Sequence, residues 1–305
     1  KTKEQNAEGQ RKSAGDITMK QRFSHIFKQN GMWILSACIM IMLLAFAAQT
    51  SGYASGGSFD AVSERLYSSF VKQDFKVWKS VIDNFHRNQN MSIDSLDYIL
   101  TVQYLYVAWT ISGDTIQAGA EKALSKALAD LDKFESRIES LPRKSYTGEL
   151  MKAKYRSYSS AFLAYQMKIA PVKVIINGWK CVNNAKAAVT DMPECCFSQI
   201  EYGNVMHSMP TVLGGSAINA RKAYMKALKI MESSEDRGST YHNWLYLHLL
   251  LCIADSYKSS EDYVKVREYY KKILTIEPSF SYVRNSLMPS LDKYEAQQKK
   301  KSKLK

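Results

Sequence analysis

Apolar residues recur at spacings of three and four along almost the whole chain beyond residue 59. This period gathers apolar side chains on one face of a helix, and the breaks are marked by Gly, Pro, Ser and Asn rather than by the alternation typical of strands. The pattern predicts an all-α fold for residues 59–298, with no sheet.

Residues 247–278 divide into two amphipathic helices around a polar turn at 258–262. Pro278 ends the second helix, because proline has no N–H for the helical hydrogen bonds and disfavours helical geometry at Glu277. A second pair is predicted upstream, with one helix over 104–111, a turn at 112–114 and another helix from 120 that runs to Ser140.

The rest of the chain predicts less regular units. Ala220, Tyr224 and Ala227 belong to the second helix of a third pair, whose first helix is interrupted by Pro210 and the glycines at 214–215. An insertion at 232–243 follows. The remaining helical segments, at about 59–86, 147–169 and 172–190, are degenerate hairpins at best, and a last helix is expected over 282–298. The array should therefore be irregular.

The pair at 247–278 resembles a tetratricopeptide repeat (TPR), which implies a TPR-like solenoid of stacked helical hairpins with a concave groove for a partner. The signature positions are Leu250, Ile253, Ala254, Tyr257, Tyr270 and Pro278. The resemblance implies a partner or ligand groove lined by first-helix residues, which map here onto Val102, Leu105, Trp109, Ser112, His248, Leu251, Asp255 and Lys258.

A more particular resemblance covers about 200–298. A Pro-x-x-x-Gly-Gly turn within 201–231, followed by the complete repeat and a last helix, is similar to the TatT family of accessory components of bacterial TRAP transporters. Members are periplasmic lipoproteins that assist a solute-binding protein. The resemblance implies a solute-binding protein as partner, and a homo-oligomer with a pore or apolar cavity.

One long apolar run precedes the helical region. Residues 32–48 carry no charge and would form about 25 Å of helix, close to a hydrocarbon core of about 30 Å. We therefore predict a single transmembrane helix at 32–50, followed by a flexible Ser/Gly-rich linker at 51–58.

The apolar run could be lipidated, cleaved or kept as an anchor. Leu35 to Cys38 spell a lipobox, but the apolar core follows the cysteine instead of preceding it, which disfavours lipidation. The small-x-small motif Ala45-Phe46-Ala47 leaves cleavage near Ala47 open. An uncleaved signal anchor is the preferred interpretation.

Charge sets the predicted orientation. Lys20, Arg22 and Lys28 precede the apolar run, whereas residues 49–64 contain no Lys or Arg. By the positive-inside rule, the basic segment 1–31 is cytoplasmic and the body is extracytoplasmic, most simply in a bacterial periplasm.

The net charge of +13 is concentrated at the ends of the chain. Residues 1–31 carry +4 and residues 293–305, which include a basic tail at 299–305, carry +5, so only +4 remains for the 261 residues between them. Without a basic stripe or a zinc or β-sheet module, the sequence does not predict nucleic-acid binding.

No motif indicates chemistry. The five histidines form no HExxH pair, and the five cysteines form no CxxC pair, so we expect no metal, no cofactor and no enzymatic activity. A hydrolase with a site unmarked in the sequence is the least favoured alternative. Cys181 is expected either to pair with Cys195 or Cys196, or to be one of three buried free thiols.

Together these patterns predict a membrane-anchored, extracytoplasmic TPR-like protein that binds a protein partner, or a small ligand passed to one, as a TatT-like transport accessory. The alternative is a non-catalytic scaffold subunit of a large envelope or organellar membrane complex.

Overall fold

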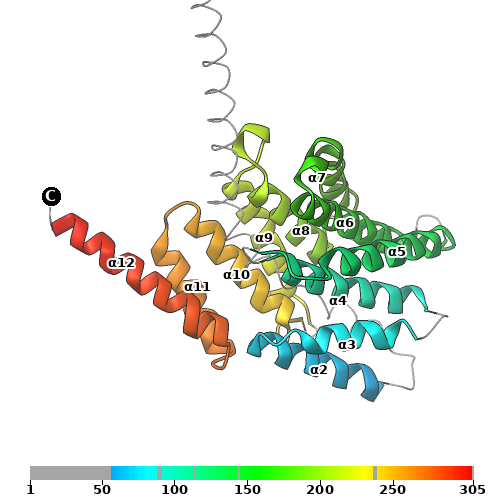
Figure 1. Cartoon of the computed structure of the whole chain (residues 1–305), viewed down its shortest axis with the longest axis horizontal. Coiled ribbons are helices and arrows are strands. Elements are labelled where there is room, and N and C mark those ends of the chain that lie inside the picture. The colour runs from blue at the N-terminus through cyan, green and yellow to red at the C-terminus, as the bar shows by residue number, and fades with distance from the viewer. Residues whose placement is uncertain (1–55, 88–90, 113–114, 143–144, 236–238, 304–305) are drawn as a thin grey trace, which may run out of the picture.

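The computed structural model describes residues 56–87, 91–112, 115–142, 145–235 and 239–303, and throughout these ranges the chain is helical, with no strand (Figure 1). This confirms the all-α prediction. The α-helices are α2 (Gly56–Lys72), α3 (Lys76–Phe85), α4 (Ile93–Ile111), α5 (Ala120–Glu139), α6 (Tyr146–Ile169), α7 (Val174–Asp191), α8 (Cys196–Ser208), α9 (Ala217–Glu232), α10 (Trp244–Lys258), α11 (Tyr263–Ile276) and α12 (Met288–Lys303). Short helical turns are η1 (Pro171–Lys173), η2 (Thr211–Leu213) and η4 (Val283–Leu287).

The predicted segment 1–31, transmembrane helix 32–50 and most of the linker 51–58 lie outside the described residues. Within the part of the chain that the structure describes, no helix combines the length and apolar content needed to cross a membrane.

The predicted helix pairs are confirmed in place. α10 and α11 meet at a turn over 259–262, and α11 ends at Ile276, just before Pro278. α4 and α5 form the upstream pair. In the third pair, α8 ends at Ser208, and the turn through Pro210 and Gly214 leads into α9.

The segment 59–86 is two helices, because Gln73 adopts a left-handed backbone conformation (φ 61°) that turns Phe75 into the core. Two predicted boundaries are wrong. Residues 56–58 of the predicted linker already belong to α2. At the other end, α12 continues to Lys303, into the predicted basic tail.

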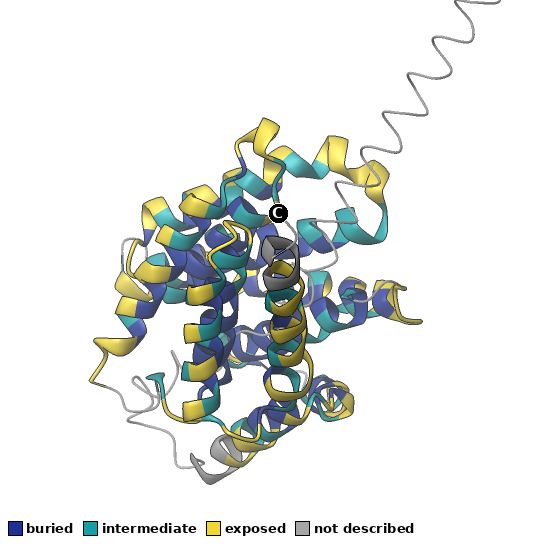
Figure 2. Cartoon of the chain, turned by 90° about the vertical axis from the view of Figure 1, so that its left-hand side faces the viewer, coloured by how far each residue is buried: buried dark blue, intermediate teal, exposed yellow. Residues whose placement is uncertain are grey.

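The helices form two layers. In the inner layer α4 packs on α6, α6 on α8 and α8 on α10, while α5, α7, α9 and α11 each pack outside against their neighbours in sequence. Most residues of α4, α8 and α10 are buried, whereas α5 and α9 bury one face (Figure 2). This arrangement is solenoid-like.

The array closes on itself, unlike an open solenoid. α2 packs against α10 (Figure 1). Trp244 at the start of α10 lies with its ring centroid 6.1 Å from that of Phe70 and 5.5 Å from that of Trp78. Phe280, which follows α11, lies 4.9 Å from Phe70. All four rings are at most 1% exposed, so the first hairpin covers apolar surface that would otherwise face solvent.

A buried ion pair joins α4 to α6. Lys154 Nζ lies 2.6 Å from Asp97 Oδ2, and the Tyr158 hydroxyl donates to Asp97 Oδ1 at 2.9 Å. The Tyr158 hydroxyl also lies 2.7 Å from Thr101 Oγ1. These contacts offset the cost of removing two charges from water and fix how α4 and α6 are aligned.

α8 and α9 approach each other closely at Gly203. A Cβ at this position would overlap the ring of Tyr224, whose hydroxyl donates to Asn204 Oδ1 at 2.9 Å. Glycine is therefore needed here for space.

We predict that Gly203→Ala lowers the free energy of unfolding by about 1–3 kcal/mol, because the methyl group displaces Tyr224. Gly178→Ala in α7 is the matched control. Its Cβ would meet only ordinary contacts at 4.0 Å, so the better helix propensity of alanine should add up to about 1 kcal/mol. Urea denaturation followed by circular dichroism measures both, and equal effects would contradict the packing argument.

Candidate functional site

Half of the predicted groove is inside the protein. Val102, Leu105, His248 and Leu251 are all buried, the first three completely. They lie on α4 and α10, whose inner faces are covered by the rest of the inner layer and by the first hairpin. The prediction that these four line an open groove is wrong, because the array closes and fills its own concave face.

The other four predicted positions remain partly accessible, and all lie at C-terminal helix ends. Trp109 and Ser112 are at the end of α4, while Asp255 and Lys258 are at the end of α10. Because α6 and α8 lie between α4 and α10 in the inner layer, the two sets do not form one continuous groove. Trp109 also stacks on Phe75, with ring centroids 5.1 Å apart.

A polar network occupies the place where the groove was expected. Glu201 of α8 accepts hydrogen bonds from Tyr104 of α4 at 3.0 Å, from Ser160 of α6 at 3.3 Å and from Asn204 at 3.4 Å. Asn204 Nδ2 also donates to the Tyr104 hydroxyl at 3.1 Å. These side chains tie three inner helices together.

Burial sets the protonation of this network. It raises the pKa of Glu201 to about 8, against the opposing effect of its three hydrogen-bond donors. Burial also lowers the pKa of His248 to about 3, so this ring is neutral. His248 Nε2 lies 2.8 Å from Cys252 Sγ, whereas its Nδ1 has no hydrogen-bond partner within the described residues.

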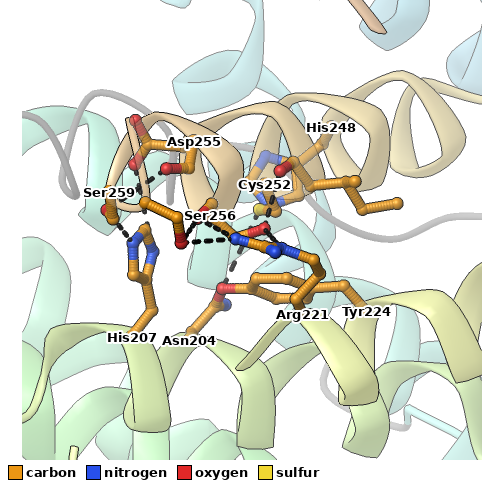
Figure 3. Close-up of polar contacts among 11 residues, drawn as sticks. Asn204, His207, Arg221, Tyr224, His248, Cys252, Asp255, Ser256 and Ser259 are labelled. Carbon is orange, nitrogen blue, oxygen red and sulfur yellow. Dashed lines mark hydrogen bonds and ion pairs between the residues drawn. The ribbon is translucent and has the colours of Figure 1, made fainter. Parts of the chain in front are cut away.

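A second polar cluster lies at the C-terminal end of α10, where α8 and α9 meet it (Figure 3). His207 of α8 places Nε2 2.8 Å from Ser259 Oγ and Nδ1 3.9 Å from Asp255 Oδ2. Burial, with a smaller contribution from the charge of Arg221, lowers the pKa of His207 to about 4.

Arg221 of α9 completes this cluster. Its guanidinium donates to the backbone oxygen of Ser256 at 2.6 Å, to Ser256 Oγ at 3.1 Å and to Ser260 Oγ at 2.7 Å. It also lies over the Tyr257 ring, 3.9 Å from the centroid. A cation at a helix C-terminus satisfies free carbonyl groups and complements the helix dipole, so Arg221 fastens α9 to the end of α10.

The order Ser259, His207, Asp255 resembles a hydrolytic triad, but the geometry differs from one. A separation of 3.9 Å between Asp255 and His207 is too long for the hydrogen bond that orients a catalytic base. A histidine with a pKa of about 4 is a weak base, and the helix C-terminus disfavours a developing oxyanion. These contacts fit a helix cap with an accessible polar edge.

Asp255 is the most distinctive group on that edge. Burial raises its pKa to about 6, and the nearby Lys258 lowers it only in part. Burial also disfavours the charged form of Lys258, whose pKa it lowers. Desolvated charges at an accessible edge are a feature of binding sites, because an incoming donor or acceptor recovers the interactions that burial has removed.

The four cysteines in the described part of the chain are free thiols. Cys181, Cys195 and Cys252 are buried, and Cys196 is half-buried. Burial raises the pKa of Cys181 to about 12, and its thiol donates to the Ser160 carbonyl at 3.3 Å. From the sequence, Cys181 is expected either to form a disulfide with Cys195 or Cys196 or to remain a free thiol, and in the structure all three are free thiols. Among the described residues, no group of three or more His, Cys, Asp or Glu side chains is arranged to hold a metal ion.

Comparison with protein-family models, with curated proteins and with solved structures finds no significant match to this chain. The site therefore has to be interpreted from its own geometry. The resemblance to a tetratricopeptide repeat named Asp255 and Lys258 as candidates, but gave no indication that His207 and Arg221 are their neighbours. The only signal for Arg221 is its position one turn into the helix that follows the glycines at 214–215.

We predict that the free energy of unfolding falls as the pH rises from about 4.5 to about 8, because Glu201 loses its proton near pH 4.5 when unfolded but only near pH 8 when folded. In Glu201→Gln the side chain cannot ionise, so the free energy of unfolding should change less between about pH 4.5 and about pH 8. Glu268→Gln, an exposed carboxylate on α11, is the control and should leave the slope unchanged. Identical slopes in wild type and Glu201→Gln would show that Glu201 does not titrate as proposed.

Proposed function

We propose that this chain is a membrane-tethered, extracytoplasmic protein of TPR-like helical hairpins, and that it binds a protein partner without chemistry of its own. The partner surface is the end of α10, where Asp255 and Lys258 lie beside the His207 and Arg221 cluster. In the TatT-like version of this proposal, the partner is a solute-binding protein and the chain assists transport.

The observation that carries this proposal is the state of Asp255. Its carboxylate is largely removed from water, with 14% of the side chain exposed. Among the described residues, Lys258 supplies a positive charge nearby, whereas His207, at 3.9 Å, has a pKa of about 4. A donor from a partner would reach an acceptor that is already partly desolvated, so the interaction loses less to dehydration than one at a fully solvated carboxylate.

The tether is supported by the sequence. Residues 32–48 are uncharged, Lys20, Arg22 and Lys28 precede them, and only seven residues separate Ala48 from the start of α2. Seven extended residues span at most about 25 Å, so a membrane anchor at 32–50 would keep the helical body close to the bilayer.

We predict that Asp255→Asn reduces co-purification of the partner after mild detergent extraction by roughly ten-fold, which corresponds to about 1.4 kcal/mol. The amide keeps the shape but loses the charge, so folding should persist and can be confirmed by circular dichroism. Quantitative mass spectrometry of crosslinked eluates identifies the proteins retained by the wild type and lost from the variant.

Glu268→Gln is the control, because this exposed carboxylate forms an ion pair with Lys265 on the surface of α11 rather than at the α10 end. Equal retention of every co-purifying protein by wild type and Asp255→Asn would contradict recognition at the α10 end. Recovery of a large stoichiometric complex that is indifferent to Asp255 would favour the scaffold alternative.

A further inference from the structure

Exposed large hydrophobic side chains are concentrated in two short stretches. Of the fourteen such side chains in the described part of the chain, eight fall within residues 172–179 and 212–218. They are Val172, Val174, Ile175, Ile176, Trp179, Val212, Leu213 and Ile218. We call these eight residues the apolar tips. Contiguous apolar residues on a surface mark a site of interaction.

The two stretches occupy neighbouring turns of the array. Residues 172–179 cover η1 and the start of α7, and residues 212–218 cover η2 and the start of α9. α8 packs against both α6 and α7, which makes the two hairpins neighbours. The η2 turn and α7 both lie at the top of Figure 1. Figure 2, which is turned about the vertical axis, shows exposed turns at the same end of the molecule.

The segments that flank the apolar tips are basic, although the hairpins as a whole also carry Glu149, Asp191, Glu201 and Glu232. Residues 150–190 hold seven Lys or Arg and no Asp or Glu, and residues 202–231 hold four and none. Lys173, Lys180 and Lys222 are exposed close to the tips, and Lys168 is half-buried. A surface that combines apolar tips with nearby exposed lysines complements an anionic, apolar partner.

A second copy of the chain does not fit this surface well, because two copies facing each other would bring like charges together. A bilayer with anionic lipids fits both properties. Valine, isoleucine and leucine enter the boundary of the acyl chains, tryptophan prefers the interface, and lysine stems reach back to the headgroups.

We propose that the apolar tips dock the helical body onto an anionic membrane surface. The η1–α7 and η2–α9 turns enter the interfacial layer, while Lys173, Lys180 and Lys222 contact the lipid phosphates. This surface is distinct from the α10 end proposed for the partner. The contact orients the body on the bilayer, whether or not residues 32–50 anchor it.

The test uses the full chain in vesicles whose acyl chains carry bromine, a short-range quencher of tryptophan fluorescence. Vesicles contain phosphatidylcholine with or without phosphatidylglycerol. The difference in quenching between wild type and Trp179→Phe isolates the signal of Trp179, which is 77% exposed in the structure. We expect bromine to quench Trp179 in anionic vesicles and much less in zwitterionic ones, with the difference reduced by high salt.

The supporting variant is the double change Val172→Asp and Val212→Asp. These valines are 75% and 91% exposed, so the protein should fold unchanged while the tips lose their affinity for lipid. Quenching of Trp179 in anionic vesicles should fall to the zwitterionic level. Val264→Asp is the matched control, because Val264 is 79% exposed but lies at the start of α11, and it should leave the quenching unchanged.

Two outcomes would overturn the proposal. Trp179 that stays open to the aqueous quencher iodide in anionic vesicles would show that the tips do not enter the membrane. Trp179 that is shielded from iodide but not quenched by bromine would show that protein covers it, either a second copy or another segment of the chain. If residues 32–50 do not insert, the protein starts in solution, and quenching of Trp179 by brominated lipid then reports docking of the tips alone. Failure of the tether therefore leaves the quenching of Trp179 in place, whereas failure of docking removes it.

Discussion

The packing of the first hairpin against α10 decides what the rest of the molecule can expose. Four aromatic rings, those of Phe70, Trp78, Trp244 and Phe280, join residues that are far apart in sequence and close the array. Because this closure covers the inner helices, positions that would line a groove in an open helical repeat become core. Of the eight predicted groove positions, those that stay accessible lie at helix ends.

Closure also explains the polar groups of the interior. Side chains such as Asp97, Lys154 and Glu201 lie on inner faces that water does not reach, so each must find partners within the protein. Asp97 and Lys154 pair with each other, and Glu201 collects three donors while its pKa rises. These contacts link α4, α6 and α8, and they favour one alignment of helices over the many that apolar packing alone would allow.

The accessible ends of the hairpins differ in chemistry. The α10 end presents Asp255 and Lys258 beside a capped helix terminus, which suits the directional contacts of a protein partner. The apolar tips of the neighbouring hairpins present valine, isoleucine and tryptophan among lysines, which suits a lipid interface. In this proposal one face of the array orients the body on a membrane and an adjacent edge recognises a partner.

The sequence by itself determined the helices, most of their ends and their pairing as hairpins, because periodicity, proline, glycine and caps act over a few residues. Through the resemblance to a tetratricopeptide repeat, it also named Asp255 and Lys258 as candidate binding residues. Only the tertiary structure decided that Val102, Leu105, His248 and Leu251 are core, and that His207 and Arg221 join Asp255. Burial and such neighbours depend on whether the array closes, which rests on contacts between residues more than 170 positions apart, such as Phe70 and Trp244. A repeat pattern describes each hairpin and its nearest neighbour, and carries no information about whether the first hairpin meets the last.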